Sequence, residues 1–192
     1  MRREDWTALV LEALRDPRAN ARRIVGLPLP DAVVWQAVAL VSVLAVLGLY
    51  GTIVLGGGGL AGPLPGPFAM AGLQVAAMVV LAGVMARAGR MFGGTGQFPG
   101  ALRLMVWLQA LMILAQVVQL VAMLILPPLA GLVSLATLVA IGWVASGLVA
   151  GLHGFKSQGI TFLGIVGTLL VVGFVLSILL LPFLPDVQGV AP

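Results

Sequence analysis

Residues 104–152 read LMVWLQALMILAQVVQLVAMLILPPLAGLVSLATLVAIGWVASGLVAGL and contain no ionisable side chain. A bilayer core about 30 Å thick needs roughly 20 apolar residues per helix, so this stretch is long enough to cross a membrane twice. Pro127 and Pro128 divide it, because proline cannot continue a helix. The stretch therefore predicts two membrane-spanning helices joined by a tight hairpin.

The rest of the chain has the same character. Its 192 residues are 61% hydrophobic and 8% charged, with a mean hydropathy of +1.17, whereas about 25% of the residues of a soluble domain are charged. We expect an all-α membrane protein, a bundle of five transmembrane helices preceded by short amphipathic cytoplasmic helices. The transmembrane domain is expected at 31–185, with spans at about 33–55, 68–85, 102–126, 129–152 and 162–184, and a short outside tail at 186–192.

The polar segment 1–30 predicts two short helices. In the second, DPRANARRIVGLP, Asp16 is the expected N-cap, Pro17 the first helical residue and Gly26 the residue just past the end. Its arginines suit a helix that lies on an anionic membrane surface; they are Arg18, Arg22 and Arg23. The alternative is an ordered polar tail that packs on the bundle.

The positions of the basic residues predict the orientation. All ten lysines and arginines fall before the first span, after the second or after the fourth, and therefore on one side of a five-span protein. The positive-inside rule places that side, with the N-terminus, in the cytoplasm. A composition rich in Ala, Gly, Leu, Val and Arg is typical of bacteria, so we expect an inner-membrane protein with a periplasmic C-terminus.

A glycine loop, GRMFGGTGQFPGALR, occupies residues 89–103. It fits neither GxxxxGK[ST] nor GxGxxG and follows a membrane helix rather than a strand, so we interpret it as a cytoplasmic connector and not as a nucleotide site. The glycines that allow its turn are Gly93, Gly94 and Gly96. The arginines expected to meet lipid phosphates there are Arg87, Arg90 and Arg103.

Groups that carry chemistry are scarce in this sequence. No ionisable residue lies deep in a span, where proton relays and ion-coupled carriers need one, and there is no cysteine. The single histidine, His153, makes no metal site by itself, and we expect it to form an interfacial hydrogen bond. We predict a protein that is not an enzyme, has no cofactor and binds no nucleic acid.

One helix face of the third span combines amides with methionines: Met105, Gln109, Met112, Gln116, Gln119 and Met123. Amides in lipid hydrogen-bond to neighbouring helices, so the face is explained by helix packing. The alternative is an adaptable polar seam, formed by Gln109, Gln116 and Gln119, that admits a lipid headgroup or a partner helix. Small residues in the fourth span also indicate close helix contacts; they are Gly142, Ser146, Gly147, Ala150 and Gly151.

Three stretches together resemble the bacterial branch of the Ypt-interacting (YIP) domain family: DPRANARRIVGLPLPDAVVW before the first span, FGGTGQF after the second and GLHGF after the fourth. The resemblance implies five spans and a cytoplasmic N-terminus. Eukaryotic members are linked to Rab-type GTPases, but their Asp-Leu-Tyr-Gly-Pro element is missing here. No functional residue is therefore carried over from the family.

These patterns favour a non-enzymatic inner-membrane protein that acts by binding, as a scaffold or accessory subunit in membrane organisation. The alternative is a lipid-handling protein, such as a scramblase or a lipid-binding bundle, and a solute channel would require an oligomer. Membrane lipids, anionic on the cytoplasmic side, are the expected partners, together with a membrane protein or further copies of the chain.

Overall fold

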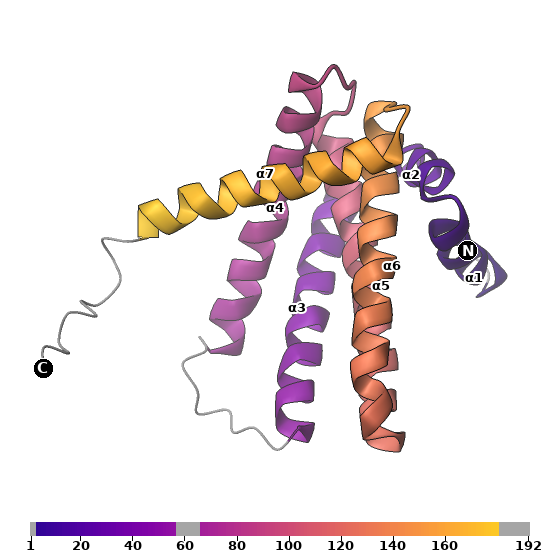
Figure 1. The fold of residues 1–192 in the computed structure, drawn as a ribbon, viewed down its shortest axis with the longest axis vertical. Coiled ribbons are helices and arrows are strands. Elements are labelled where there is room, and N and C mark those ends of the chain that lie inside the picture. Colours follow the sequence, from indigo (N-terminus) through magenta and orange to yellow (C-terminus); the bar gives the residue numbers. More distant parts are fainter. Residues whose placement is uncertain (1–2, 57–65, 181–192) are drawn as a thin grey trace, which may run out of the picture.

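The computed structural model describes residues 3–56 and 66–180, and within these ranges it contains seven helices (Figure 1). They are α1 (Arg3–Arg15), α2 (Pro17–Val25), α3 (Asp31–Leu55), α4 (Pro67–Met91), α5 (Phe98–Ile125), α6 (Pro127–His153) and α7 (Gln158–Leu180). Five of them are long and apolar enough to cross a membrane, which confirms the five long apolar helices expected from the sequence. The expected end of the fifth span at 181–184 and the tail at 186–192 lie outside the described residues.

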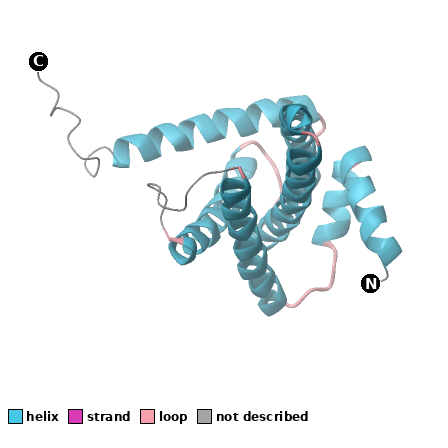
Figure 2. Ribbon diagram, turned by 90° about the horizontal axis from the view of Figure 1, so that it is seen from below, coloured by secondary structure: helices cyan, strands magenta, loops and turns pink. Residues whose placement is uncertain are grey.

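The five long helices do not all run in the same direction. Helices α3 to α6 lie side by side, whereas α7 crosses them near the end that carries α2 and the α6–α7 turn (Figures 1 and 2). The sequence predicted a bundle of five spans, so the crosswise α7 is a difference in arrangement. Its cause is that α7 packs mainly on α6 and has no second long neighbour to align it.

The predicted hairpin is present between α5 and α6. Helix α5 ends at Ile125 and α6 begins at Pro127, so only Leu126 separates them. The amide of Gln119 on α5 donates a hydrogen bond of 2.9 Å to the carbonyl of Ala130 on α6. This bond joins the two helices close to the turn.

The two N-terminal helices pack on the bundle. The side chain of Asp16 accepts a 2.9 Å hydrogen bond from the amide of Ala19, Pro17 opens α2, and Gly26 follows its end, all as the sequence predicted. Helix α2 lies against α6 at Gly147 and Gly151. The packing alternative for this segment is therefore observed, and membrane contact stays a prediction for its exposed arginines.

Two clusters of buried hydrophobic residues join the N-terminal helices and the bundle. The first joins α1 and α2 to α5 and α6 through Leu9, Ala13, Ala21, Ile24, Leu104, Trp107, Val144 and Leu148. The second joins α3, α4 and α5 through Val34, Val38, Val41, Met78, Ala82, Ala86, Ala101 and Leu102. The residues of both clusters lie mainly in the first halves of α3 and α5 and in the last halves of α4 and α6. These halves are at the end of the bundle that carries the glycine loop, so the core lies there.

Candidate functional site

The glycine loop is built around His153, at the C-terminal end of α6. The amide of Gly96 donates to Nδ1 of His153 over 3.1 Å, and Nε2 lies 3.1 Å from the carbonyl oxygen of Met85 on α4. Because Nδ1 accepts a hydrogen bond, the ring proton belongs on Nε2, which donates to Met85. The expected hydrogen-bonding role of His153 is confirmed, and both ring nitrogens are used.

Three glycines leave room for this imidazole. A Cβ atom at Gly89, Gly94 or Gly96 would overlap the ring of His153. A second contact fixes the loop, because the amide of Thr95 donates to the backbone carbonyl of His153 over 3.4 Å. We call His153 with residues 89–96 the histidine latch; it is a cradle for an imidazole ring, which is why the loop needs its glycines.

Two left-handed glycines, one in the α4–α5 loop and one in the α6–α7 turn, complete the latch. Gly93 has a φ of 81° and Gly154, just after α6, has a φ of 74°, values that L side chains rarely adopt. The stretches FGGTGQF and GLHGF therefore meet in space, although about 55 residues separate them in the chain. The sequence offered each as a motif and gave no sign that they touch.

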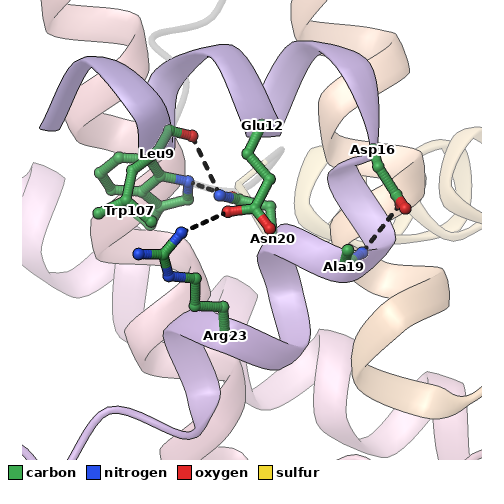
Figure 3. Close-up of polar contacts among 7 residues, drawn as sticks. All are labelled: Leu9, Glu12, Asp16, Ala19, Asn20, Arg23 and Trp107. Carbon is green, nitrogen blue, oxygen red and sulfur yellow. Dashed lines mark hydrogen bonds and ion pairs between the residues drawn. The ribbon is translucent and has the colours of Figure 1, made fainter. Parts of the chain in front are cut away.

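A second polar cluster fixes α1 and α2, and sequence reasoning missed it. The fully buried Asn20 donates from Nδ2 to the carbonyl of Leu9 over 3.1 Å and accepts from Nε1 of Trp107 over 2.7 Å (Figure 3). The ring of Trp6 stacks on Trp107 with centroids 6.2 Å apart. Asn20 lies four residues before Ile24 on the buried face of α2, and this spacing was the available signal.

The arginines fall into two groups. Arg22, Arg87 and Arg90 are exposed, as headgroup contact requires. Arg23 is also exposed and forms an ion pair of 3.2 Å with Glu12 (Figure 3). Arg18 donates to the backbone carbonyl of Lys156 over 3.0 Å, which ties α2 to the α6–α7 turn.

Arg103, which was expected to meet lipid phosphates, makes contacts within the chain. Its guanidinium donates to the backbone carbonyls of Val25, Leu27 and Leu29 over 2.9 to 3.1 Å. These contacts fix the connection between α2 and α3. Arg103 therefore has a structural role in the connector, and its contact with lipid phosphates stays a prediction.

The glutamines of α5 face three different helices. Gln109 accepts a 3.0 Å hydrogen bond from Gln74 on α4, and Gln119 bonds to Ala130 on α6. Gln116 occupies the space that Gly48 leaves on α3. These are the interhelical contacts that the packing alternative predicts, and the Oε1 atoms of Gln116 and Gln119 stay buried without a hydrogen bond.

A cavity of about 720 Å³ lies beside the histidine latch. Helices α4, α5 and α6 and the first turns of α7 form its walls. Its lining is apolar apart from a few residues of the α6–α7 turn and of α7. Within the described part of the chain no group of three His, Asp or Glu side chains gathers as metal ligands would.

Comparison with known proteins identifies the chain by its family. A family model for the Yip1 domain matches residues 11–179, a range that includes the Asn20 cluster, the histidine latch and nearly all of α7. Comparison with curated proteins and with solved structures gave no match. Because the match covers most of the chain, this protein belongs to the Yip1 domain family.

Proposed function

We propose that this chain is a non-enzymatic membrane protein that acts by binding, as a scaffold or accessory subunit in membrane organisation. Its partner is a membrane helix, of another protein or of a second copy, that packs along α7. The observation that carries the proposal is the attachment of α7, which packs mainly on α6 although it is long enough to cross a bilayer.

The use of the polar side chains supports an architectural role. His153 holds the glycine loop, Asn20 holds α1 against Trp107, and Arg103 holds the α2–α3 connection. Each of these side chains forms its hydrogen bonds with the backbone or with a neighbouring side chain. Such networks rigidify a bundle and present its outer surface in a fixed form.

The exposed apolar surface of α7 is available for a partner helix to pack against. From Gln158 to Ile178, Thr161 alone is buried, and side chains such as Leu163, Leu170 and Phe174 are more than 60% exposed. Helices associate in a bilayer through close packing and interhelical hydrogen bonds, and small residues on the surface favour both. Gly164, Gly167 and Gly173 provide small positions along α7.

The location belongs to the same proposal. We place the protein in a bacterial inner membrane with its N-terminus in the cytoplasm, because all ten basic residues gather on one side of the predicted spans. The seam alternative for Gln109, Gln116 and Gln119 is not carried into the proposal, since these amides already contact neighbouring helices. The glycines of the loop, including Gly93, Gly94 and Gly96, serve the latch and are given no ligand.

Photo-crosslinking in intact membranes tests the partner helix. A photoreactive residue replaces Leu170 on α7, which is 69% exposed, or Leu138 on α6, which is 70% exposed and serves as the matched control. We expect a crosslinked polypeptide of defined mass from position 170 only. The mass separates a second copy from another protein; equal yields from both positions, or none from either, would overturn the proposal.

A further inference from the structure

We propose that the cavity beneath α7 binds one anionic phospholipid, with an acyl chain inside it and the phosphate at Lys156. This goes beyond the partner helix proposed above, because it concerns a small ligand at a different place. The cavity lies between α4, α5, α6 and the first turns of α7, whereas the partner helix would use the outer surface of α7.

The size and lining of the cavity fit a hydrocarbon chain. Its volume of about 720 Å³ lies within the ~300–1,000 Å³ typical of small-molecule sites. Three helices contribute the apolar wall, which includes Leu81, Val84, Leu104, Leu108, Leu148 and Val149. An apolar wall of this extent gives a chain of methylene groups contacts along its whole length.

The hydroxyl groups in the wall do not make it polar. Thr161 donates its hydroxyl hydrogen to the carbonyl of Ser157 over 2.8 Å, and Thr168 donates to the carbonyl of Gly164 over 2.8 Å. Both threonines therefore present mainly their methyl groups. The polar end of the cavity is the α6–α7 turn, where Lys156 and Ser157 line it.

Charge complementarity selects an anion for that end. The sequence from Gly66 to Leu180 contains no aspartate or glutamate, so α4 to α7 carry no acidic side chain. Lys156 is exposed at the cavity, whereas Arg87 and Arg90 of the nearby α4 turn are exposed and line a separate surface hollow. A phosphate group at Lys156 would meet a cation for which these helices provide no carboxylate partner.

The polar end is also held in place before a ligand arrives. Phe155 lines the cavity and stacks on His153 with ring centroids 5.3 Å apart. The backbone carbonyl of Lys156 accepts the hydrogen bond from Arg18. The histidine latch and α2 thus fix the turn that carries the cation, and a site organised in advance loses less freedom on binding.

A titration with single lipids tests the proposal on the full chain. Delipidated protein in neutral detergent is titrated with phosphatidylglycerol or with phosphatidylcholine of the same acyl chains, and bound lipids are counted by native mass spectrometry. We expect saturation at one phosphatidylglycerol per chain and weaker binding of phosphatidylcholine. Lys156→Gln should reduce the preference about fivefold, the weight of one basic side chain near an anionic headgroup.

Two glycines of α7 provide a matched pair of variants. A Cβ atom at Gly164 or at Gly167 would meet no atom within 4 Å, but only Gly164 lines the cavity. Gly164→Leu should fill the cavity and abolish the single tight lipid, whereas Gly167→Leu should retain it. Equal lipid counts for wild type and Gly164→Leu would show ordinary surface lipid and overturn the proposal, as would equal affinity for the two lipids.

A mapping experiment provides a readout that does not depend on variants. Phosphatidylglycerol with a photoreactive group in its acyl chain is added at one equivalent, irradiated, and located by peptide sequencing. We expect the label on cavity residues such as Val84 and Leu148. Label spread evenly over the exposed faces of α3 and α5 would contradict a defined site.

Discussion

Helices α2 and α7 both pack on the C-terminal part of α6, but they differ in how much of their surface is buried there. Helix α2 is short and polar, yet Pro17, Asn20, Ala21 and Ile24 are buried among its nine residues. Helix α7 is long, with a mean hydropathy of 2.4 over its most apolar stretch, yet of the residues Gln158–Ile178 it buries Thr161 alone. The more apolar helix is thus the less buried one.

The difference lies in shape and in directional bonds. Gly147 and Gly151 of α6 let Pro17 and Ala21 of α2 approach closely, and Asn20 adds two hydrogen bonds. Helix α7 is bonded to α6 through its first residue, Gln158, whose amide donates an exposed hydrogen bond of 2.8 Å to the carbonyl of Trp143 and a partly buried one of 3.1 Å to the hydroxyl of Ser146. Hydrophobicity does not choose a partner in a bilayer, because lipid tails are as apolar as leucine.

The sharpest test of this comparison concerns the direction of α7 in a bilayer. Helix α7 is long enough to span the membrane, but its contact with α6 and the cavity that it covers both depend on its crosswise direction. The chain has no cysteine, so single cysteines at Ala191 and Arg22 can be labelled with a membrane-impermeant maleimide. We expect labelling of both cysteines from the same side of the membrane.

Labelling of the two cysteines from opposite sides would contradict that expectation. It would mean that α7 turns to span the bilayer beside α3 to α6 and no longer covers the cavity. The effect is all-or-none, which makes it the largest of those expected here.

Closing the space for α2 should have the next largest effect. A Cβ atom at Gly151 would lie 2.7 Å from the Cβ of Ala21 and 2.7 Å from the carbonyl oxygen of Arg18. We expect Gly151→Leu to lower the free energy of unfolding in detergent by about 3 kcal/mol, the upper end for an overpacked contact. Gly131→Leu on the same helix is the control, because a Cβ there meets nothing within 4 Å. Equal stability of the two variants would show that α2 does not depend on this fit.

Replacing Asn20 tests the hydrogen bonds of its side-chain amide separately from the close packing of α2 at Gly147 and Gly151. Asn20→Leu leaves the indole N–H of Trp107 and the carbonyl of Leu9 buried without this partner. Because one unsatisfied buried group costs ~1–3 kcal/mol and the indole N–H loses its partner, we expect a loss of about 1–3 kcal/mol in the free energy of unfolding. Trp143→Phe removes an exposed hydrogen bond to Leu14 and should cost less than 1.5 kcal/mol, roughly the weight of one ordinary hydrogen bond. A larger loss for Trp143→Phe than for Asn20→Leu would reverse our ranking of the two contacts.

The histidine latch gives a smaller, local effect. His153→Leu leaves the buried amide of Gly96 without its acceptor, so we expect a loss of about 1–3 kcal/mol and faster amide hydrogen exchange from Gly93 to Gln97. Gly94→Ala should accelerate exchange in the same residues, because its Cβ would displace the imidazole. Unchanged exchange in both variants would mean that His153 does not hold the loop.

The sequence was sufficient for features that depend on a single segment. Apolar length predicted the five long helices, the two prolines predicted the α5–α6 hairpin, and Asp16, Pro17 and Gly26 predicted the limits of α2. These features need no knowledge of what lies opposite in space. Hydropathy and helix caps are local properties of the chain.

Features that join distant segments were not predictable in this way. The glycines around His153 suggested a connector with a tight turn, because a glycine required for close approach looks the same in sequence as one required for a turn. Arg103 looked like a lipid-facing charge, since nothing in its neighbourhood shows that three carbonyls after α2 lie within reach. The direction of α7 was likewise undetermined, because its few polar residues form no continuous polar face that would orient the helix.

Helix α7 should be the least sensitive part of the molecule to the loss of a side chain. Leu170 is 69% exposed and Trp107, in the cluster that holds α2, is 6% exposed. We expect Leu170→Ala to change the free energy of unfolding in detergent by less than about 0.5 kcal/mol, as for other exposed positions. Trp107→Ala should cost about 3–5 kcal/mol, the usual result for a buried aromatic residue. If the same Leu170→Ala variant lost stability in native membranes but not in detergent, the difference would measure what covers α7 there, because the isolated chain supplies no contact for that side chain to lose.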